Sequence, residues 1–192
     1  MTGDRAVGVR FVIDGSCGRL VMCVEGWVTD ECEGSLFLPE ERRDALQALI
    51  EFDVAEPSGA AQDRWAAYHG EPRYRCWASA RITGVRRENE VCEEAELAPV
   101  NPLRPAESRL LKLLNAQRGA LEGVCERLSG VKVPQACAVG LDPHGIDVRA
   151  RFGIVRAEFP REECGSAGCI ECPDRAAEVI ASMLRTAGGS TV

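Results

Sequence analysis

The chain is poor in histidine, lysine and aromatic residues. Of its 192 residues only two are histidines, His69 and His144, only two are lysines, Lys112 and Lys132, and 5% are aromatic. So few rings argue against a base-stacking surface, and the formal net charge of −7 would repel a phosphate backbone. These shortages predict no nucleic-acid partner. Because the histidines lie in separate halves of the chain, they also exclude a His-rich metal site.

Long apolar runs and familiar catalytic motifs are also missing. No apolar run approaches the roughly 20 residues that span a bilayer, and residues 1–14 lack the apolar core of a secretory leader. We therefore expect a cytoplasmic protein with no membrane partner. The sequence has no phosphate-binding P-loop, no G-x-G-x-x-G that opens a helix and no G-x-S-x-G. We expect no catalysis.

The first half of the chain has the pattern of β-strands with one helix. Short β-rich runs predict strands over 9–13, 19–28 and 34–38, and alternation along 73–86 predicts a long strand. Pro39, which suits the first turn of a helix, and the apolar residues that follow it predict a helix over 39–52. Proline and glycine punctuation predicts a loop over 53–72.

The second half follows a stretch rich in glutamate and proline, over 87–105. A strong apolar stripe predicts one helix over 106–129, and a closing helix is expected over 174–187. Between them we expect strands over 136–141, 146–152 and 154–159, the first two joined by a type I turn at Asp142-Pro143-His144-Gly145. The prediction is an α+β chain with domains at 1–98 and 105–188 and a linker at 99–104.

The second half of the chain resembles the C-terminal domain of haem-utilisation and pyridoxamine-phosphate-oxidase-like split-barrel proteins. The segments that carry the resemblance are ESRLLKLLNAQRGALEGVCERLSG and AVGLDPHGIDVRARFGIVRAEFPRE. The resemblance implies an N-terminal antiparallel split-barrel-like β domain and a C-terminal helix–β-meander–helix domain. It also implies a homodimer and three possible roles: haem degradation, flavin binding, or protein-partner regulation of tetrapyrrole metabolism.

Two departures from that family argue against inherited catalysis. Haem-binding relatives carry histidines on both sides of the helix asparagine, where this chain has Leu113 and Arg118, so that imidazole ligand is missing. The first half also lacks a cluster that repeats the flavin-phosphate site. We therefore expect a non-catalytic protein that binds a haem, tetrapyrrole or flavin-type ligand. The alternative is a degenerate split-barrel regulator that binds a protein partner.

Ten cysteines include a cluster at Cys164, Cys169 and Cys172. The C-x4-C-x2-C spacing matches three ligands of a plant-type iron–sulfur cluster, and zinc would use the same thiolates. The fourth-ligand candidates are Cys137, Cys125, Cys32 and His144. A plain Gly/Cys loop of reduced thiols and a thiol redox or haem-ligating loop remain as alternatives. The cysteines inside apolar strand-like runs, Cys23, Cys76 and Cys137, are expected to be small buried hydrophobes.

Overall fold

The computed structural model describes residues 6–42, 44–93, 101–166 and 168–188. The chain divides into two compact units, Met1–Val100 and Asn101–Val192. The expected α+β class is confirmed, because antiparallel sheets and helices occur together. The predicted linker begins outside the described residues, and its remainder from Asn101 belongs to the second unit.

The first unit is built on one six-stranded antiparallel sheet in the order β1-β2-β5-β4-β3, with β6 also paired to β5. The long strand β5 pairs with β4 on one side, and with β2 and then β6 on the other. The strands are β1 (Phe11–Asp14), β2 (Arg19–Val24), β3 (Glu33–Leu38), β4 (Leu46–Phe52), β5 (Cys76–Arg87) and β6 (Glu90–Glu93).

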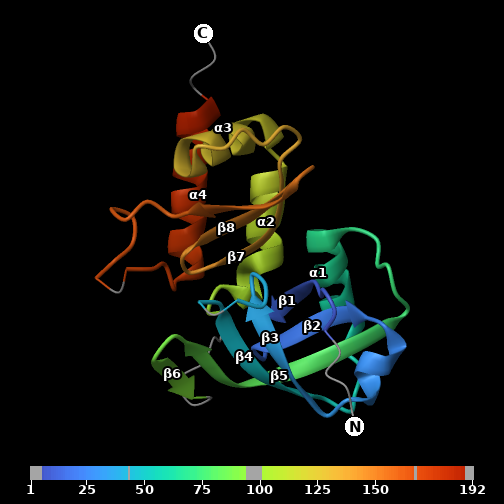
Figure 1. The fold of residues 1–192 in the computed structure, drawn as a ribbon. Coiled ribbons are helices and arrows are strands. Elements are labelled where there is room, and N and C mark those ends of the chain that lie inside the picture. Colours follow the sequence, from blue (N-terminus) through green and yellow to red (C-terminus); the bar gives the residue numbers. More distant parts are fainter. Residues whose placement is uncertain (1–5, 43, 94–100, 167, 189–192) are drawn as a thin grey trace. The chain divides into compact units, whose positions relative to one another are not determined.

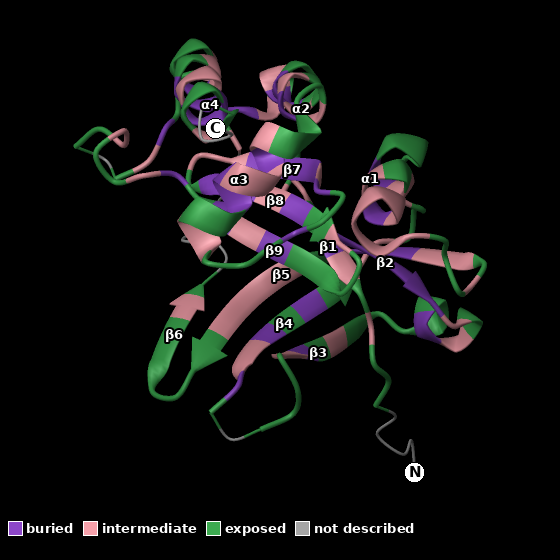
Figure 2. Cartoon of the chain, turned by 90° about the horizontal axis from the view of Figure 1, so that it is seen from above, coloured by how far each residue is buried: buried purple, intermediate pink, exposed green. Residues whose placement is uncertain are grey.

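Both faces of β2 are covered, which explains its unbroken apolar sequence. Leu20, Met22 and Val24 enter one core with residues of β3, β4 and β5. Val21 and Cys23 enter a second core with Trp65, so β2 is buried along nearly its whole length (Figure 2). The split-barrel expectation holds only as an antiparallel sheet. Within the described residues the two edge strands, β1 and β3, are not paired with each other, so the barrel is not closed.

The predicted helix over 39–52 is wrong. Residues 46–52 form β4, where Ala48 and Ile50 are buried and Leu49 is 50% exposed. A short apolar run fits both helical and strand spacing. Pairing with β3 and β5 decides the outcome here, because it satisfies the backbone and buries alternate residues.

The predicted loop over 53–72 is also wrong, because it contains α1 (Gly59–His69). Ser58 caps the helix by accepting a hydrogen bond from the Ala61 N–H, and Gly70 ends it at a φ of 82°. Ala61 and Trp65, four residues apart, are its buried contacts. Two buried residues are too few for a helical period to be recognised in the sequence. However, a serine cap before the helix and a glycine after it are helix boundary signals that the sequence carries.

His69, at the end of α1, makes the stability of the first unit depend on pH. Its Nε2 lies 3.0 Å from the carbonyl oxygen of Phe11. Burial lowers the pKa of the imidazole, Arg10 lowers it further, and the Phe11 carbonyl opposes them. The unfolded chain therefore binds more protons once the pH falls below the ordinary value near 6.5, and stability is lost on acidification.

We expect the melting temperature of the wild-type protein to fall between about pH 7 and about pH 5.5, and to fall less in His69→Gln. Thermal unfolding followed by circular dichroism measures both. The matched control is His144→Gln, because His144 is exposed in a turn of the other unit. Equal acid sensitivity in wild type and His69→Gln would contradict the role assigned to His69.

The second unit begins with a short 3-10 turn (Arg104–Ala106) and two helices, α2 (Glu107–Asn115) and α3 (Arg118–Ser129). The prediction of a single helix over 106–129 is therefore wrong. Gln117 leaves the helical conformation, with φ −127° and ψ 61°, and α3 runs in a different direction from α2 (Figure 1). The apolar stripe continues across the break because both helices face one core that includes Leu114 and Leu121.

The three strands of the second unit form an antiparallel meander in the order β7-β8-β9, as expected from the sequence. They are β7 (Cys137–Asp142), β8 (Gly145–Ala150) and β9 (Gly153–Glu158). The β7–β8 turn is fixed by the Asp142 carboxylate, which accepts a hydrogen bond of 2.8 Å from the His144 N–H. The helix α4 (Pro173–Gly188) completes the core. No helix in the described ranges has the length and apolar character needed to span a bilayer.

Candidate functional site

The second unit contains an open pocket with a volume of about 600 Å³, which we call the arginine pocket. Three of its lining residues carry guanidinium groups. The full lining is Arg118, Glu122, Pro134, Gln135, Cys137, Arg149, Ala150 and Arg151. The pocket is a region of positive charge in an acidic chain, because it sets three guanidiniums against one carboxylate.

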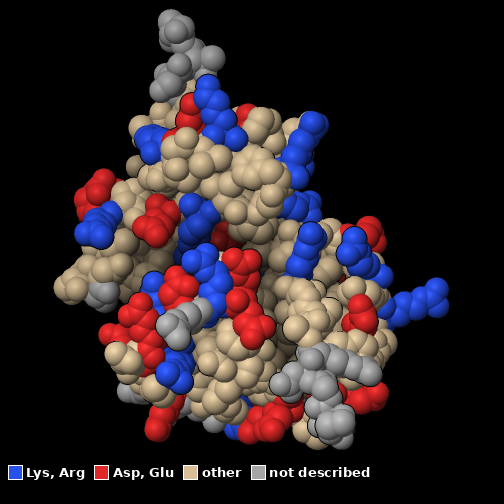
Figure 3. Space-filling view, in the orientation of Figure 1, with Lys and Arg blue, Asp and Glu red and all other residues tan. Residues whose placement is uncertain are grey.

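Three parts of the fold bring these residues together. Arg118 is the first residue of α3, and Glu122 lies one turn later on the same face. Cys137 and Arg149 are direct partners across the β7–β8 ladder, so their side chains project from the same face of the sheet. Arg151 follows in the β8–β9 turn, at the end of the sheet where Figure 3 shows basic side chains along the edge of this unit.

A series of hydrogen bonds through Gln135 fixes one wall of the pocket. The Gln135 backbone N–H donates to the Glu122 carboxylate at 2.7 Å. The side-chain oxygen of Gln135 accepts from the Arg151 guanidinium at 3.2 Å. Gln135 has a φ of 60°, which an L-residue adopts only when its surroundings require it. These bonds tie the loop before β7 to both α3 and the β8–β9 turn.

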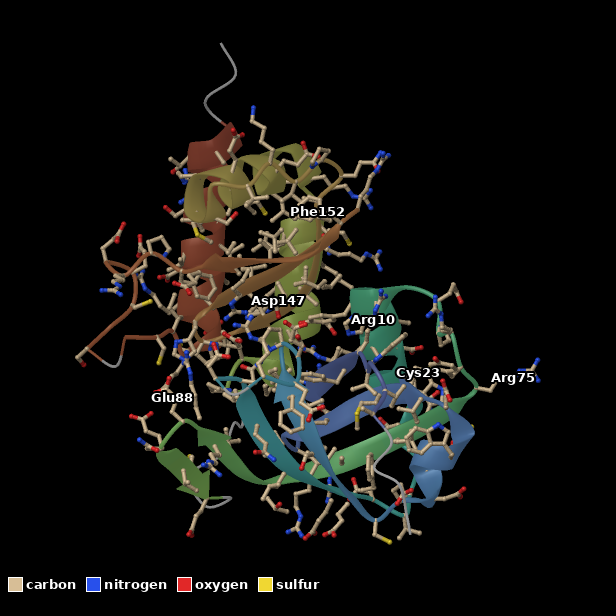
Figure 4. The ribbon with its side chains drawn as sticks, in the orientation of Figure 1. Arg10, Cys23, Arg75, Glu88, Asp147 and Phe152 are labelled. Atoms are coloured by element: carbon tan, nitrogen blue, oxygen red, sulfur yellow. The ribbon has the colours of Figure 1, made fainter. Side chains whose placement is uncertain are left out.

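Exposed apolar side chains lie next to the pocket. Phe152, labelled in Figure 4, follows Arg151 in the turn and is 67% exposed. Ile154 is the partner of Arg149 on β9 and is 36% exposed. A ligand with anionic groups and an apolar body would therefore find contacts of both kinds at this end of the sheet.

A further arginine, Arg156 on β9, has a structural role outside the pocket. Arg156 donates to both Asp142 and Asp147, the latter at 2.9 Å and labelled in Figure 4. Burial alone would lower the pKa of this guanidinium, but the hydrogen bonds and charges of the two carboxylates outweigh it and raise the pKa. Arg156 therefore serves as a cross-strand link, and it does not line the arginine pocket.

The structure does not support a metal centre at the predicted cysteines. Cys164 packs against the core of the second unit, while Cys172 is exposed just before α4. Desolvation raises the pKa of the Cys169 thiol, and Glu171 and Cys164 raise it further. Across the described ranges, no three His, Cys, Asp or Glu side chains are grouped closely enough to hold a metal ion.

The fourth-ligand candidates are dispersed. Cys125 lies fully buried in the core. Burial and the nearby charge of Glu122 raise the pKa of its thiol to about 11, although a hydrogen bond with its own backbone acts in the opposite direction. His144 is exposed in the β7–β8 turn, and Cys32 belongs to the first unit. Of the cysteines expected to be buried, Cys23 is buried as predicted, whereas Cys76 and Cys137 are only partly buried. Cys137 is only partly buried because it begins the edge strand β7 and lines the arginine pocket.

The two positions singled out by their missing histidines have different environments. Leu113 is partly buried against the core, and Arg118 lines the arginine pocket. Sequence reasoning missed Glu122, Gln135, Arg149 and Arg151. The available signal was the pair of arginines two residues apart at the end of β8, although arginine is too common in this chain for that signal to stand out.

A smaller pocket in the first unit has a volume of about 240 Å³ and is also lined by arginines. There Arg42 makes ion pairs with Glu40 and Asp44, and Arg86 donates to the Glu88 carbonyl. The arginine pocket is the stronger candidate because it is the larger of the two and is lined by three arginines, whereas the smaller pocket is lined by two.

Comparison with known proteins identifies a fold and no family. No protein-family model and no curated protein matches the chain. One similar structure is Atu2129 from Agrobacterium tumefaciens str. C58, a protein of unknown function, with a TM-score of 0.63 and 17% identity over 92% of this chain and 82% of that one. A heme-binding protein from Mycobacterium smegmatis has 18% identity over 95% of this chain and 86% of that one. Its TM-score of 0.39 is too low to carry an argument. At such identities the first likeness shows a shared fold alone.

Proposed function

We propose that this chain is a non-catalytic binding protein whose second unit holds a small anionic ligand in the arginine pocket. The observation that carries the proposal is the convergence of three guanidinium groups on one pocket in a chain of net charge −7. Guanidinium groups bind carboxylates and phosphates through paired, charge-assisted hydrogen bonds. The attraction of an anion to these three guanidiniums opposes its repulsion by the net negative charge of the protein.

The ligand class that we propose is a tetrapyrrole or a flavin phosphate. A tetrapyrrole carries carboxylates and a flavin phosphate carries a phosphate, and each has a flat apolar ring system. The pocket volume of about 600 Å³ lies in the usual range for small-molecule sites. Phe152 and Ile154 supply exposed apolar surface for the ring, and Arg118, Arg149 and Arg151 supply partners for the acid groups.

Titration of the protein with haemin, with metal-free protoporphyrin and with flavin mononucleotide, followed by absorbance, tests this proposal. We expect at least one of them to bind. Replacing Arg149 by Gln should weaken that binding about tenfold, which corresponds to about 1.4 kcal/mol, because one charge-assisted contact is lost. Arg118→Gln should act in the same direction.

Glu122→Gln is the matched control of opposite sign. Its side-chain oxygen can still accept from the Gln135 N–H, but the one carboxylate in the pocket is removed, so an anionic ligand should bind more tightly. Binding that is unchanged in all three variants would place the ligand elsewhere. No binding of any of the three ligands would remove the tetrapyrrole and flavin assignment.

The homodimer and the regulatory role with a protein partner, both implied by the family resemblance, stay predictions. Neither is needed for the arginine pocket, because every residue that lines it comes from one unit of one chain.

A further inference from the structure

Cys137 is the only one of the ten cysteines that lines the arginine pocket. Its thiol is partly exposed, and its Sγ has only a weak contact, 3.9 Å from the Ala138 carbonyl oxygen. Because Cys137 and Arg149 are ladder partners, the sulfur and the guanidinium leave the sheet on the same face. The pocket therefore combines a nucleophile with a surface that attracts anions.

Two of the three exposed thiols, Cys32 and Cys172, are flanked by acidic residues, whereas the third, Cys17, lies in the turn between β1 and β2. Cys32 lies between Glu31 and Glu33, and Cys172 lies between Glu171 and the Pro173-Asp174 pair. An anionic reagent approaching these sulfurs meets carboxylates, whereas at Cys137 it meets three guanidiniums. Charge should therefore direct anionic reagents to Cys137 in preference to Cys32 and Cys172.

We propose that Cys137 is a site of reversible thiolation by small disulfides that carry carboxylate groups. The Cys137 thiolate attacks one sulfur of the disulfide, the original S–S bond breaks, and a mixed disulfide forms. The released half leaves as a thiolate and takes up a proton, so the incoming disulfide is the oxidant and no other is needed. The guanidiniums hold the carboxylates of the incoming disulfide beside the attacking sulfur.

The proposal uses the same guanidiniums as the proposed function, and it would regulate that function. A mixed disulfide at Cys137 places carboxylates inside the pocket, where they compete with an anionic ligand. A thiol reductant restores the free pocket by the reverse exchange. Ligand binding would then depend on the redox state of small thiols around the protein.

The test compares a dianionic aromatic disulfide, dithiobis-nitrobenzoate, with the neutral dipyridyl disulfide on the full chain. After brief exposure the remaining thiols are alkylated at low pH, and peptide mass spectrometry gives the modification rate at each cysteine. The ratio of the anionic to the neutral rate should be higher at Cys137 than at Cys32 by on the order of tenfold. Using Cys32 in the same sample cancels the intrinsic difference between the reagents.

The preference should shrink in Arg149→Gln and at high salt, because both weaken the attraction. Oxidised glutathione should modify Cys137 before Cys32. Equal rate ratios at the two cysteines, or a preference untouched by both salt and Arg149→Gln, would overturn the proposal. Titration of the wild-type protein and of Cys137→Ser with haemin and flavin mononucleotide separates this proposal from the proposed function. If neither protein binds either ligand, the proposed function is removed, and the preference of Cys137 for anionic disulfides still stands.

Discussion

Alanine at Gly145 is expected to lower the free energy of unfolding of the second unit by about 3 kcal/mol. A Cβ at this position would lie 2.4 Å from the Ala157 carbonyl oxygen and 2.8 Å from the Glu158 Cα. Both atoms belong to the backbone of β9, which is paired with β8 here, so neither can turn away as a side chain would. Relief requires the two strands to separate, which weakens their hydrogen bonds.

Chemical denaturation followed by circular dichroism measures this loss, and Gly119→Ala is the matched control in the same unit. A Cβ at Gly119, the second residue of α3, would meet no atom within 4 Å. Alanine there should be neutral or should stabilise the helix by up to about 1 kcal/mol. If Gly145→Ala unfolds at the same denaturant concentration as the wild type, the close approach of β8 and β9 is wrong.

Gly145 also shows how far the sequence predicts this fold. The Asp142-Pro143-His144-Gly145 pattern predicts the turn between β7 and β8, because each residue suits its turn position. The structure adds a second reason for the glycine, the nearby backbone of β9, which no local pattern contains. Local signals therefore located the meander, and only the packing shows why Gly145 tolerates no side chain.

The two errors in the first unit have a common cause. Both β4 and α1 are short, and each buries only a few residues: Ala48 and Ile50 in the strand, Ala61 and Trp65 in the helix. Too few residues repeat for the spacing to separate a helix from a strand. Their identity depends on partners elsewhere in the chain, namely β3 and β5 for the strand and β1 and β2 for the helix.

The candidate site could not be read from the sequence for a related reason. Cys164, Cys169 and Cys172 attract attention because they are close in sequence, yet the described structure does not group them as ligands. The arginine pocket is assembled from α3, the following loop, β7 and the end of β8, so its residues are scattered over 118–151. Sequence proximity favoured the cysteines, and the pairing of β7 with β8 produced the pocket.

The second large effect is expected at Asn115, whose side chain holds the edge strand β7 at Ala138. Its amide nitrogen donates to the Ala138 carbonyl oxygen at 2.9 Å, and its amide oxygen accepts from the Ala138 N–H at 2.8 Å. The side chain thus pairs with the edge strand β7 as a neighbouring strand would. Ala138 is 3% exposed, so water cannot easily replace these bonds.

Asn115→Ala should therefore cost roughly 2–4 kcal/mol, because it leaves a buried donor and a buried acceptor unpaired. Asn115→Asp should be at least as harmful at neutral pH, since it sets a carboxylate against the Ala138 carbonyl oxygen. Denaturant unfolding gives the free energies, and hydrogen exchange at the Ala138 amide reports the bond itself. Gln117→Ala is the control, within about 0.5 kcal/mol of wild type, because Gln117 is exposed and its side chain does not cap α3. Fast exchange at Ala138 in the wild-type protein would contradict the pairing, and with it the fixed position of the adjacent Cys137 in the arginine pocket.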